Sequence, residues 1–314
     1  MRYLLRFFVV IFILACAIEV VLRTKYGFCN APLYVADQDY EYIFAPNQNL
    51  TRFGNKISTN HFSMRSKEVE STDSTVILLI GDSVINGGNL TDQDSLATTK
   101  LEERLSREMQ QKVRVLNIAA GSWGPDNMAA YLRKYGTFNA KLICLVTSSH
   151  DIHDIMGHEP IVGVNINMPN KQYKVAWVEL WERYKDIILY QIKETISPSP
   201  KEPEVHTPTE PALTLDESGI IKSGSGFNPG YQEILDIANK DAIPLIIYLH
   251  PEISEVQAGQ FNSQGKQIEA FAQQHHIPLY NELNLGIQLD EYRKMDVIHY
   301  NDLGQNKLAD RLSP

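Results

Sequence analysis

Short runs of apolar and β-branched residues recur along the chain, separated by longer stretches of mixed polarity. Each run is too continuous for a strand with one face in water and is typical of a parallel strand covered on both faces. These runs predict strands over 75–80, 113–118, 142–147, 244–249 and 277–280.

Helical periodicity fills the intervals between several of these strands. Apolar positions at helical spacing predict helices over 95–110, 126–135 and 264–275, the second of them opened by Pro125 and stopped by Gly136. The alternation of strand and helix predicts an α/β fold, a three-layer α/β/α sandwich with a parallel sheet of about five strands. In such folds ligands bind at the carboxyl ends of the strands.

Residues 160–230 break this alternation. A helical stretch over 176–195 carries Trp177 and Trp181 four positions apart, a spacing that predicts a stripe facing the core. The Pro-rich run SPSPKEPEVHTPTEPA that follows is typical of a flexible loop. We interpret 160–230 as an insertion over the sheet edge within a domain of residues 71–314, with 24–70 as a connector that carries no clear pattern.

The first 23 residues have the pattern of a membrane-targeting segment. An unbroken apolar run from Phe7 to Ile18 follows the basic residues Arg2 and Arg6, which predicts export. The segment is either cleaved near its small residues or retained as a signal-anchor. Residues 4–22 supply 19 positions against the roughly 20 that a membrane-spanning helix needs.

We favour the retained anchor, because Glu19 can pair with Arg23 one helical turn later, near the membrane interface. Lipid attachment at Cys16 fits the flanking residues less well. The remaining alternative is a buried helix of a soluble protein. The anchor predicts a membrane-anchored protein whose body is extracytoplasmic, in a bacterial periplasm or at the cell surface.

Composition narrows the classes of function. The net charge is −9, and residues 24–314 carry 26 basic and 37 acidic side chains, a net −11. This sign disfavours nucleic-acid binding and attraction to anionic lipid. The three cysteines form no CxxC pair and are too scattered for a disulfide framework.

Two short motifs carry candidate chemistry. The first predicted strand ends in Gly81-Asp82-Ser83, a tight turn that can lift a hydroxyl above the sheet, although a helix-capping serine explains the tripeptide equally well. Near the other end of the chain, Asp296 precedes His299 by three positions, so one turn of chain can aim the carboxylate at Nδ1 of the imidazole. The alternative for this motif is an ordinary capped helix.

Each motif occupies the position that the other requires: a serine after the first strand of the sheet, and an Asp/His turn before the last helix. With these two motifs the sequence resembles the SGNH hydrolase family, also called the GDSL family. The resemblance implies a flavodoxin-like sandwich in which Ser83 is the nucleophile, His299 the base and Asp296 the residue that orients it. It also implies an oxyanion hole formed by the N–H groups of Ser83 and Gly121. Because Ser122 and Gly124 lie close by, the match at Gly121 is uncertain by a residue or more.

The third block departs from the family pattern. Where the family has Gly-x-Asn-Asp, this chain reads Ser148-Ser149-His150-Asp151, so His150 stands in place of the oxyanion-hole asparagine. An imidazole N–H can still donate a hydrogen bond, but losing one such donor costs about 3 kcal/mol of transition-state stabilisation. Activity is therefore expected to be reduced, redirected or absent.

A metal site is the alternative reading of the same region. Imidazole and carboxylate side chains alternate densely from position 150 onward, but their spacing matches no zinc signature. The residues are His150, Asp151, His153, Asp154 and His158. We predict no metal and no cofactor.

Two further residues lie near the predicted site. Trp123 follows the second block and either stacks on a sugar ring or, more often for a single tryptophan, packs inside the fold. His250 ends a predicted strand and either lines the pocket or fills it.

The resulting prediction is an extracytoplasmic serine esterase of SGNH type. The resemblance suggests acyl, and specifically acetyl, esters of envelope or exported carbohydrate as substrates. An O-acyltransferase that uses the same acyl-enzyme, a catalytically degenerate glycan-binding or assembly protein, and a metal-dependent hydrolase remain alternatives. The predicted partners are an acylated small molecule or carbohydrate and the membrane.

Overall fold

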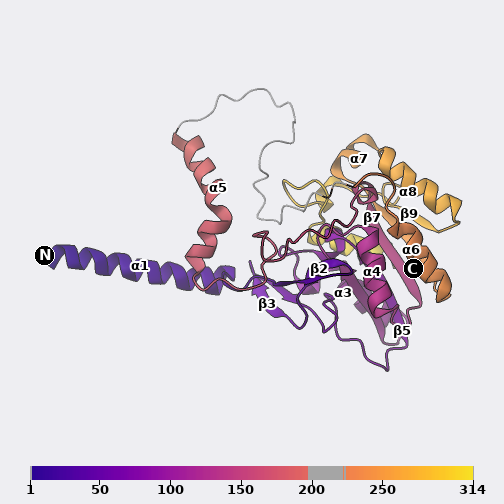
Figure 1. The fold of residues 1–314 in the computed structure, drawn as a ribbon, viewed down its shortest axis with the longest axis horizontal. Helices are drawn as coiled ribbons and strands as arrows, with labels where there is room; N and C mark the ends of the chain where they lie inside the picture. Colours follow the sequence, from indigo (N-terminus) through magenta and orange to yellow (C-terminus); the bar gives the residue numbers. More distant parts are fainter. Residues whose placement is uncertain (1, 197–221, 223, 314) are drawn as a thin grey trace.

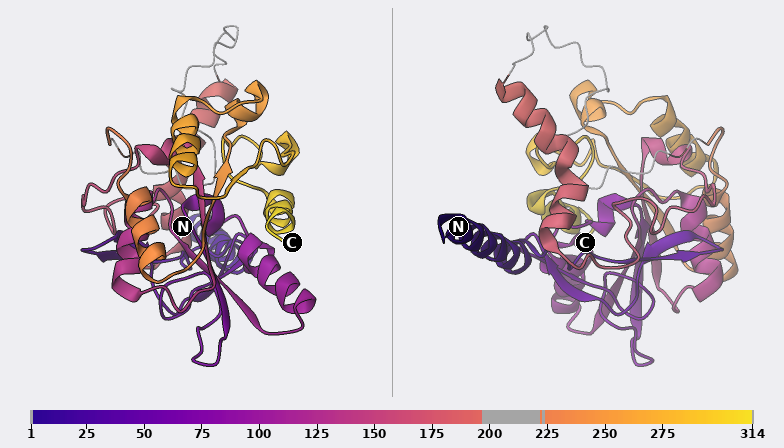
Figure 2. Two further views of the ribbon diagram at one scale, coloured as in Figure 1. Left: turned by 90° about the vertical axis from the view of Figure 1, so that its right-hand side faces the viewer. Right: turned by 60° about the vertical axis from the view of Figure 1, so that its left-hand side comes forward.

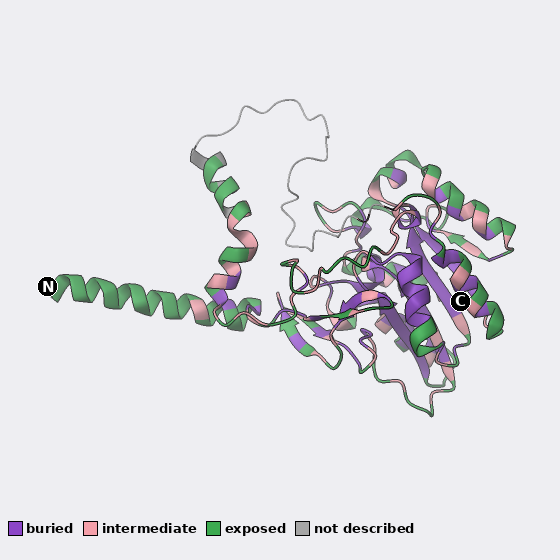
Figure 3. Ribbon diagram, in the orientation of Figure 1, coloured by how far each residue is buried: buried purple, intermediate pink, exposed green. Residues whose placement is uncertain are grey.

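A long N-terminal helix projects from a compact body (Figure 1) in the computed structural model, which describes residues 2–196, 222 and 224–313. This helix, α1 (Arg2–Tyr26), is exposed along nearly its whole length (Figure 3). It is the one helix among the described residues that is long and apolar enough to cross a membrane. Glu19 and Arg23 form the expected ion pair, with 2.7 Å between carboxylate and guanidinium.

The body is built on a five-stranded sheet, as predicted. All neighbouring strands are parallel, and their order is β6-β5-β7-β8-β9. The strands are β5 (Thr75–Gly81), β6 (Val113–Ala119), β7 (Leu142–Ser148), β8 (Leu245–His250) and β9 (Leu279–Asn281). Each lies within two residues of its predicted bounds.

Helices cover both faces of the sheet, which confirms the three-layer sandwich (Figures 1 and 2). Successive residues of β5 point to opposite faces, so Leu78 and Ile80 join one core cluster and Leu79 the other. One face is covered by α4 (Pro125–Tyr135), α6 (Gly230–Lys240) and α8 (Ser263–Gln274), and the other by α3 (Ala97–Glu108) and α9 (Asp302–Arg311). The short helices α2 (Ser83–Asn86) and α7 (Ile253–Ala258) follow β5 and β8.

The segment 24–70, predicted as a connector, contains two antiparallel hairpins. Their strands are β1 (Tyr34–Asp37), β2 (Glu41–Phe44), β3 (Asn49–Arg52) and β4 (Asn55–Ser58). Tyr42 and Ile43 are fully buried in the core cluster that includes α4. The hairpins are therefore packed into the body and extend its core.

Arg65 fastens the segment after β4 to the loop that follows α2. Its buried guanidinium donates hydrogen bonds to the carbonyl oxygens of Asn86 (2.8 Å), Gly88 (3.0 Å) and Thr91 (3.1 Å). We expect Arg65→Met to lower the free energy of unfolding by about 2–4 kcal/mol, because it leaves buried carbonyl groups without donors.

The measurement is urea denaturation of the full chain in mild detergent, followed by tryptophan fluorescence. Lys67→Met is the matched control: its ion pair with Glu102 is made by a side chain 62% exposed, so the expected loss is under about 1 kcal/mol. Equal losses for the two variants would contradict the role assigned to Arg65.

The predicted helix in the insertion is α5 (Ala176–Ile196), and it starts beside α1 rather than on the sheet (Figure 1). The expectation that Trp177 and Trp181 face the core is wrong, since their side chains are 51% and 47% exposed. The first half of α5 is packed against the body, through Ala176, Leu180 and Tyr184 in the cluster with Leu22 and Phe28. The Pro-rich run that was predicted as a flexible loop lies outside the described residues.

Candidate active site

The turn after β5 holds Ser83 at the carboxyl end of the sheet. A Cβ on Gly81 would lie 2.8 Å from the carbonyl oxygen of Val146 on β7, so the close packing of the two strands requires glycine there. The carboxylate of Asp82 accepts the amide of Val84 at 2.9 Å and caps α2. Ser83 is thereby fixed at the first position of α2, with its side chain partly exposed.

The Asp296–His299 turn meets Ser83 from the other end of the chain. Nε2 of His299 lies 2.8 Å from Oγ of Ser83, and Nδ1 of His299 lies 2.8 Å from Oδ2 of Asp296. The second oxygen of Asp296 accepts the amides of Ile298 at 2.9 Å and His299 at 3.0 Å. The structure therefore joins the three predicted catalytic side chains in one hydrogen-bonded chain.

The electrostatics favour a histidine that accepts a proton from the serine. Burial raises the pKa of Asp296, but hydrogen bonds from His299 and two backbone amides outweigh it and hold that pKa well below its ordinary value. Because the ionised carboxylate of Asp296 can only accept a hydrogen bond, His299 carries its ring proton on Nδ1 and donates it to that carboxylate. Nε2 is then a lone-pair acceptor for the Ser83 hydroxyl.

A buried ionic network supports the loop that carries His299. The imidazole of His250 lies 2.6 Å from Glu282 through Nδ1 and 2.8 Å from the carbonyl oxygen of Ile298 through Nε2. Tyr300 donates to Glu282 at 2.6 Å, and Arg311 pairs with the same carboxylate at 2.6 Å. Hydrogen bonds at Ile298 and Tyr300 thus hold the chain on both sides of His299 to His250 and Glu282. His250 is therefore a buried residue that positions the site.

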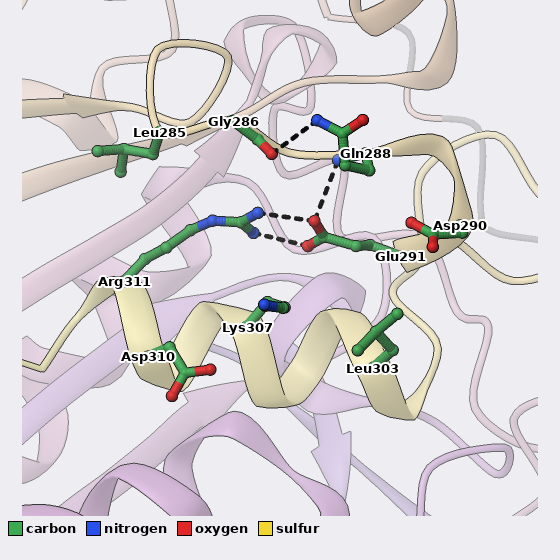
Figure 4. Close-up of a pocket in the computed structure, with 9 residues that line it drawn as sticks. All are labelled: Leu285, Gly286, Gln288, Asp290, Glu291, Leu303, Lys307, Asp310 and Arg311. Atoms are coloured by element: carbon green, nitrogen blue, oxygen red, sulfur yellow. Dashed lines mark hydrogen bonds and ion pairs between the residues drawn. The ribbon is translucent and has the colours of Figure 1, made fainter.

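Arg311 also closes one wall of a surface pocket beside α9 (Figure 4). Its guanidinium forms a two-pronged ion pair with Glu291, with both N–O distances at 2.7 Å. Burial lowers the pKa of Arg311, but Glu291 and Glu282 outweigh it and raise that pKa. Because both carboxylates already neutralise this charge, Arg311 supports the loop and is not available to a ligand in the pocket.

Gly121 is the residue that the sequence predicts as the second oxyanion donor. Gly81 and Ala119 are register partners on the neighbouring strands β5 and β6, so Ser83 and Gly121 both follow two residues beyond this pair. The Gly121 carbonyl is held by the Tyr42 hydroxyl at 2.9 Å. Among the described residues, neither the Ser83 amide nor the Gly121 amide has an acceptor, so both can donate to a ligand.

His150 is surrounded by carboxylates. Its Nε2 lies 3.4 Å from Asp151, 3.8 Å from Asp82 and 3.9 Å from Asp154, and its Nδ1 lies 3.4 Å from Glu252. Burial lowers the pKa of His150, but these four carboxylates outweigh it and raise that pKa to about 10. At neutral pH the site therefore holds an imidazolium beside Asp82, next to the predicted nucleophile.

This charge state can be measured. We expect the ring signals of His150 in an NMR titration to remain those of the charged imidazolium from pH 6 to pH 9, with loss of the proton near pH 10. Glu252→Gln removes one facing carboxylate and should move the midpoint down by about one pH unit, while other histidines keep theirs. A His150 midpoint near 6.5 in the unchanged chain would contradict the assignment.

Part of the acidic cluster has the geometry of a cation site. Asp82, His150 and Asp151 each offer a ligand atom within 4.8 Å of the others. Oδ1 of Asp151 is buried without a hydrogen-bond partner, which is the donor chemistry that a divalent cation takes. His153 instead contacts the carbonyl oxygen of Gly226 at 2.8 Å.

Trp123 is a packing residue. Its side chain is fully buried in the core cluster, and its indole N–H donates to the carbonyl oxygen of Tyr42 at 2.8 Å. It therefore holds the first hairpin against the turn that contains Gly121 and is closed to a sugar ring.

No family model and no curated protein matches this chain. Solved structures of similar fold include a protein assigned to the lipolytic G-D-S-L family from Desulfitobacterium hafniense DCB-2, at 9% identity, 76% coverage of this chain, 97% of that chain and a TM-score of 0.38. The lipase/acylhydrolase from Enterococcus faecalis is 11% identical, with 76% of this chain and 93% of that chain covered and a TM-score of 0.41. The acetyl xylan esterase AlAXEase is 11% identical, with 76% of this chain and 97% of that chain covered and a TM-score of 0.38. The first of these proteins carries the G-D-S-L name, and the other two are described as a lipase/acylhydrolase and an acetyl xylan esterase.

Proposed function

We propose that this protein is a serine esterase of SGNH type, held at the membrane by α1 with its body outside the cytoplasm. The observation that carries the proposal is the hydrogen-bonded chain from Ser83 through His299 to Asp296, with both contacts at 2.8 Å. Three groups in this order convert a weak hydroxyl nucleophile into a reactive one. They also match, residue by residue, the blocks that the sequence shares with the family.

The reaction follows from these positions. Oγ of Ser83 bonds to the ester carbonyl carbon while His299 takes the hydroxyl proton at Nε2. The negative carbonyl oxygen then accepts the amides of Ser83 and Gly121, with the charged His150 beside them. His299 returns its proton to the leaving alcohol as the acyl–oxygen bond breaks, and water enters by the reverse sequence to release the carboxylic acid.

The proposed substrates are acyl esters, above all acetyl esters, of envelope or exported carbohydrate. The resemblance to anchored members of the family and the apolar helix α1 support this choice. Transfer of the acyl group to a sugar hydroxyl uses the same acyl-enzyme, and only the acceptor differs. An O-acyltransferase is therefore the closest alternative, followed by a degenerate glycan-binding protein.

Metal-dependent hydrolysis is a second candidate because of one observation, the unpartnered Oδ1 of Asp151 beside Asp82 and His150. The imidazolium assigned to His150 counts against it, since a metal ligand must first lose that proton. The serine mechanism needs no metal, so the two candidates differ in their response to a chelator.

The test is hydrolysis by the full chain in detergent, with p-nitrophenyl acetate, p-nitrophenyl octanoate and acetylated xylan as substrates, with and without EDTA. The proposal expects release of acetate that EDTA leaves unchanged, with the acetyl ester preferred over the octanoyl ester. Complete loss in EDTA would support the metal candidate. A folded protein inert towards all three substrates would favour a binding role.

A further inference from the structure

We propose that α5 is a membrane-surface helix, whose exposed side chains Trp177, Trp181 and Ile192 insert into the interfacial region of the lipid bilayer that α1 crosses. This inference rests on the proposed anchoring by α1 and adds to it a second contact between the body and the membrane. The occupant of this face is the lipid surface itself.

The first support is the joint between the two helices. The carboxylate of Glu19 accepts the amides of Ala176 at 2.9 Å and Trp177 at 3.3 Å, which caps the start of α5. Arg23 pairs with Glu19 and donates to the carbonyl oxygen of Lys174 at 2.6 Å. The first turn of α5 is thus fixed to the last third of α1.

The second support is the level of this joint along α1. From Arg2 to Glu19 the helix rises about 26 Å, close to the roughly 30 Å thickness of the hydrocarbon core. If Arg2 and Arg6 lie at one interface, Glu19 and Arg23 lie at the other, and α5 starts there. It then runs across the direction of α1 (Figures 1 and 2), along the membrane surface.

The third support is the direction in which the tryptophans point. Successive helical residues are about 100° apart, which places Trp177 and Glu179 about 160° apart, and likewise Trp181 and Arg183. Glu179 is fully buried against Arg52 of the body at 2.8 Å, and Arg183 donates to Ile166 at 2.6 Å. Each tryptophan therefore points away from Glu179 and Arg183 and from the part of the body that these two residues contact.

The chemistry of this face fits an interface. Trp177, Trp181 and Ile192 are 51%, 47% and 48% exposed, and they lie within about 60° of one another around the helix axis. Tryptophan favours the boundary between headgroups and acyl chains, where its ring is apolar and its N–H remains hydrated. The body is strongly acidic and is not attracted to anionic lipid. The contact therefore depends on the burial of apolar and aromatic side chains.

The test uses the fact that the chain has three tryptophans, of which Trp123 is fully buried. The full chain is reconstituted in phosphatidylcholine vesicles, with or without lipids brominated near the top of the acyl chains. We expect bromine to remove more than about half of the tryptophan emission. Flotation of the vesicles and hydrolysis of p-nitrophenyl acetate are recorded on the same samples.

The matched control moves the indole to the opposite face of α5. In a chain carrying Trp177→Phe and Trp181→Phe, only Trp123 remains and bromine should have no effect. Adding Asp186→Trp places an indole about 180° from position 177, where it should remain unquenched. Equal quenching of the unchanged chain and this variant would overturn the proposal.

The other outcomes are separable. A chain that floats with the vesicles but keeps its full emission refutes the surface helix and leaves the anchor intact. If this result accompanies a doubled particle size that Trp177→Ser and Trp181→Ser reverse, the face binds a second copy instead. A chain that fails to float refutes both membrane contacts, whereas esterase activity on the soluble ester tests the catalytic proposal independently.

Discussion

Replacing Ser83 by alanine is expected to lower kcat/KM for p-nitrophenyl acetate by at least about 10⁴-fold, because no acyl-enzyme can form without the hydroxyl. Oγ of Ser83 is the atom that Nε2 of His299 contacts at 2.8 Å. The oxyanion donors and substrate binding remain in the variant, so a small residual rate over water is expected.

The control for this substitution is Ser313→Ala. The Ser313 hydroxyl donates to the carbonyl oxygen of Ala309 in the last turn of α9 and lies outside the proposed site. It should leave hydrolysis unchanged. If the Ser83 variant kept more than a tenth of the activity while folded, Ser83 would not be the nucleophile.

Replacing Asp296 by asparagine is expected to lower kcat by about 10³–10⁴-fold with little change in KM. The carboxylate holds the Nδ1 proton of His299 at 2.8 Å and is itself fixed by two backbone amides. An amide in its place can present its NH₂ group to Nδ1, which moves the ring proton to Nε2. Nε2 then has no lone pair for the Ser83 proton.

Initial rates over a range of ester concentrations separate kcat from KM in this experiment. Asp302→Asn, at the exposed start of α9, is the matched control and should leave both constants unchanged. A fall of less than tenfold for the Asp296 variant would show that Asp296 does not orient the base.

The parallel sheet could be predicted because its strands are apolar on both faces. The runs over 76–80 and 142–146 contain no charged or amide side chain, so they lack the polar alternation of a strand with one face in water. The hairpins of segment 24–70 could not be predicted, since their four-residue strands mix polar and apolar residues and their order comes from tertiary contacts. The hydrogen bond from Tyr42 to Gly121 is one such contact, made between residues 79 positions apart.

The periodicity of α5 was predicted correctly, but not the environment of its apolar face. A stripe of Trp177 and Trp181 is compatible with a protein core, a partner or a lipid surface, because periodicity reports only which residues share a face. The joint through Glu19 decides where α5 begins, and no local pattern in the sequence connects positions 19 and 176.

The candidate triad could be predicted because two local motifs, each ambiguous alone, fit the ends of the same sheet. The network of His250, Glu282 and Arg311 could not, since its members are scattered and share no spacing. The position of His250 at the end of a strand was its one signal. The carboxylates around His150 were visible as a dense acidic stretch, but Asp82 and Glu252 join them only through the fold.

The central claim is that Ser83 is an activated nucleophile that works without metal. The most direct measurement treats the folded full chain with a fluorophosphonate probe in the presence of a chelator and maps the modified residue by mass spectrometry, with His299→Ala as the comparison. Modification confined to Ser83 and abolished in the His299 variant is the predicted result. An unmodified Ser83 in the folded protein would contradict the claim.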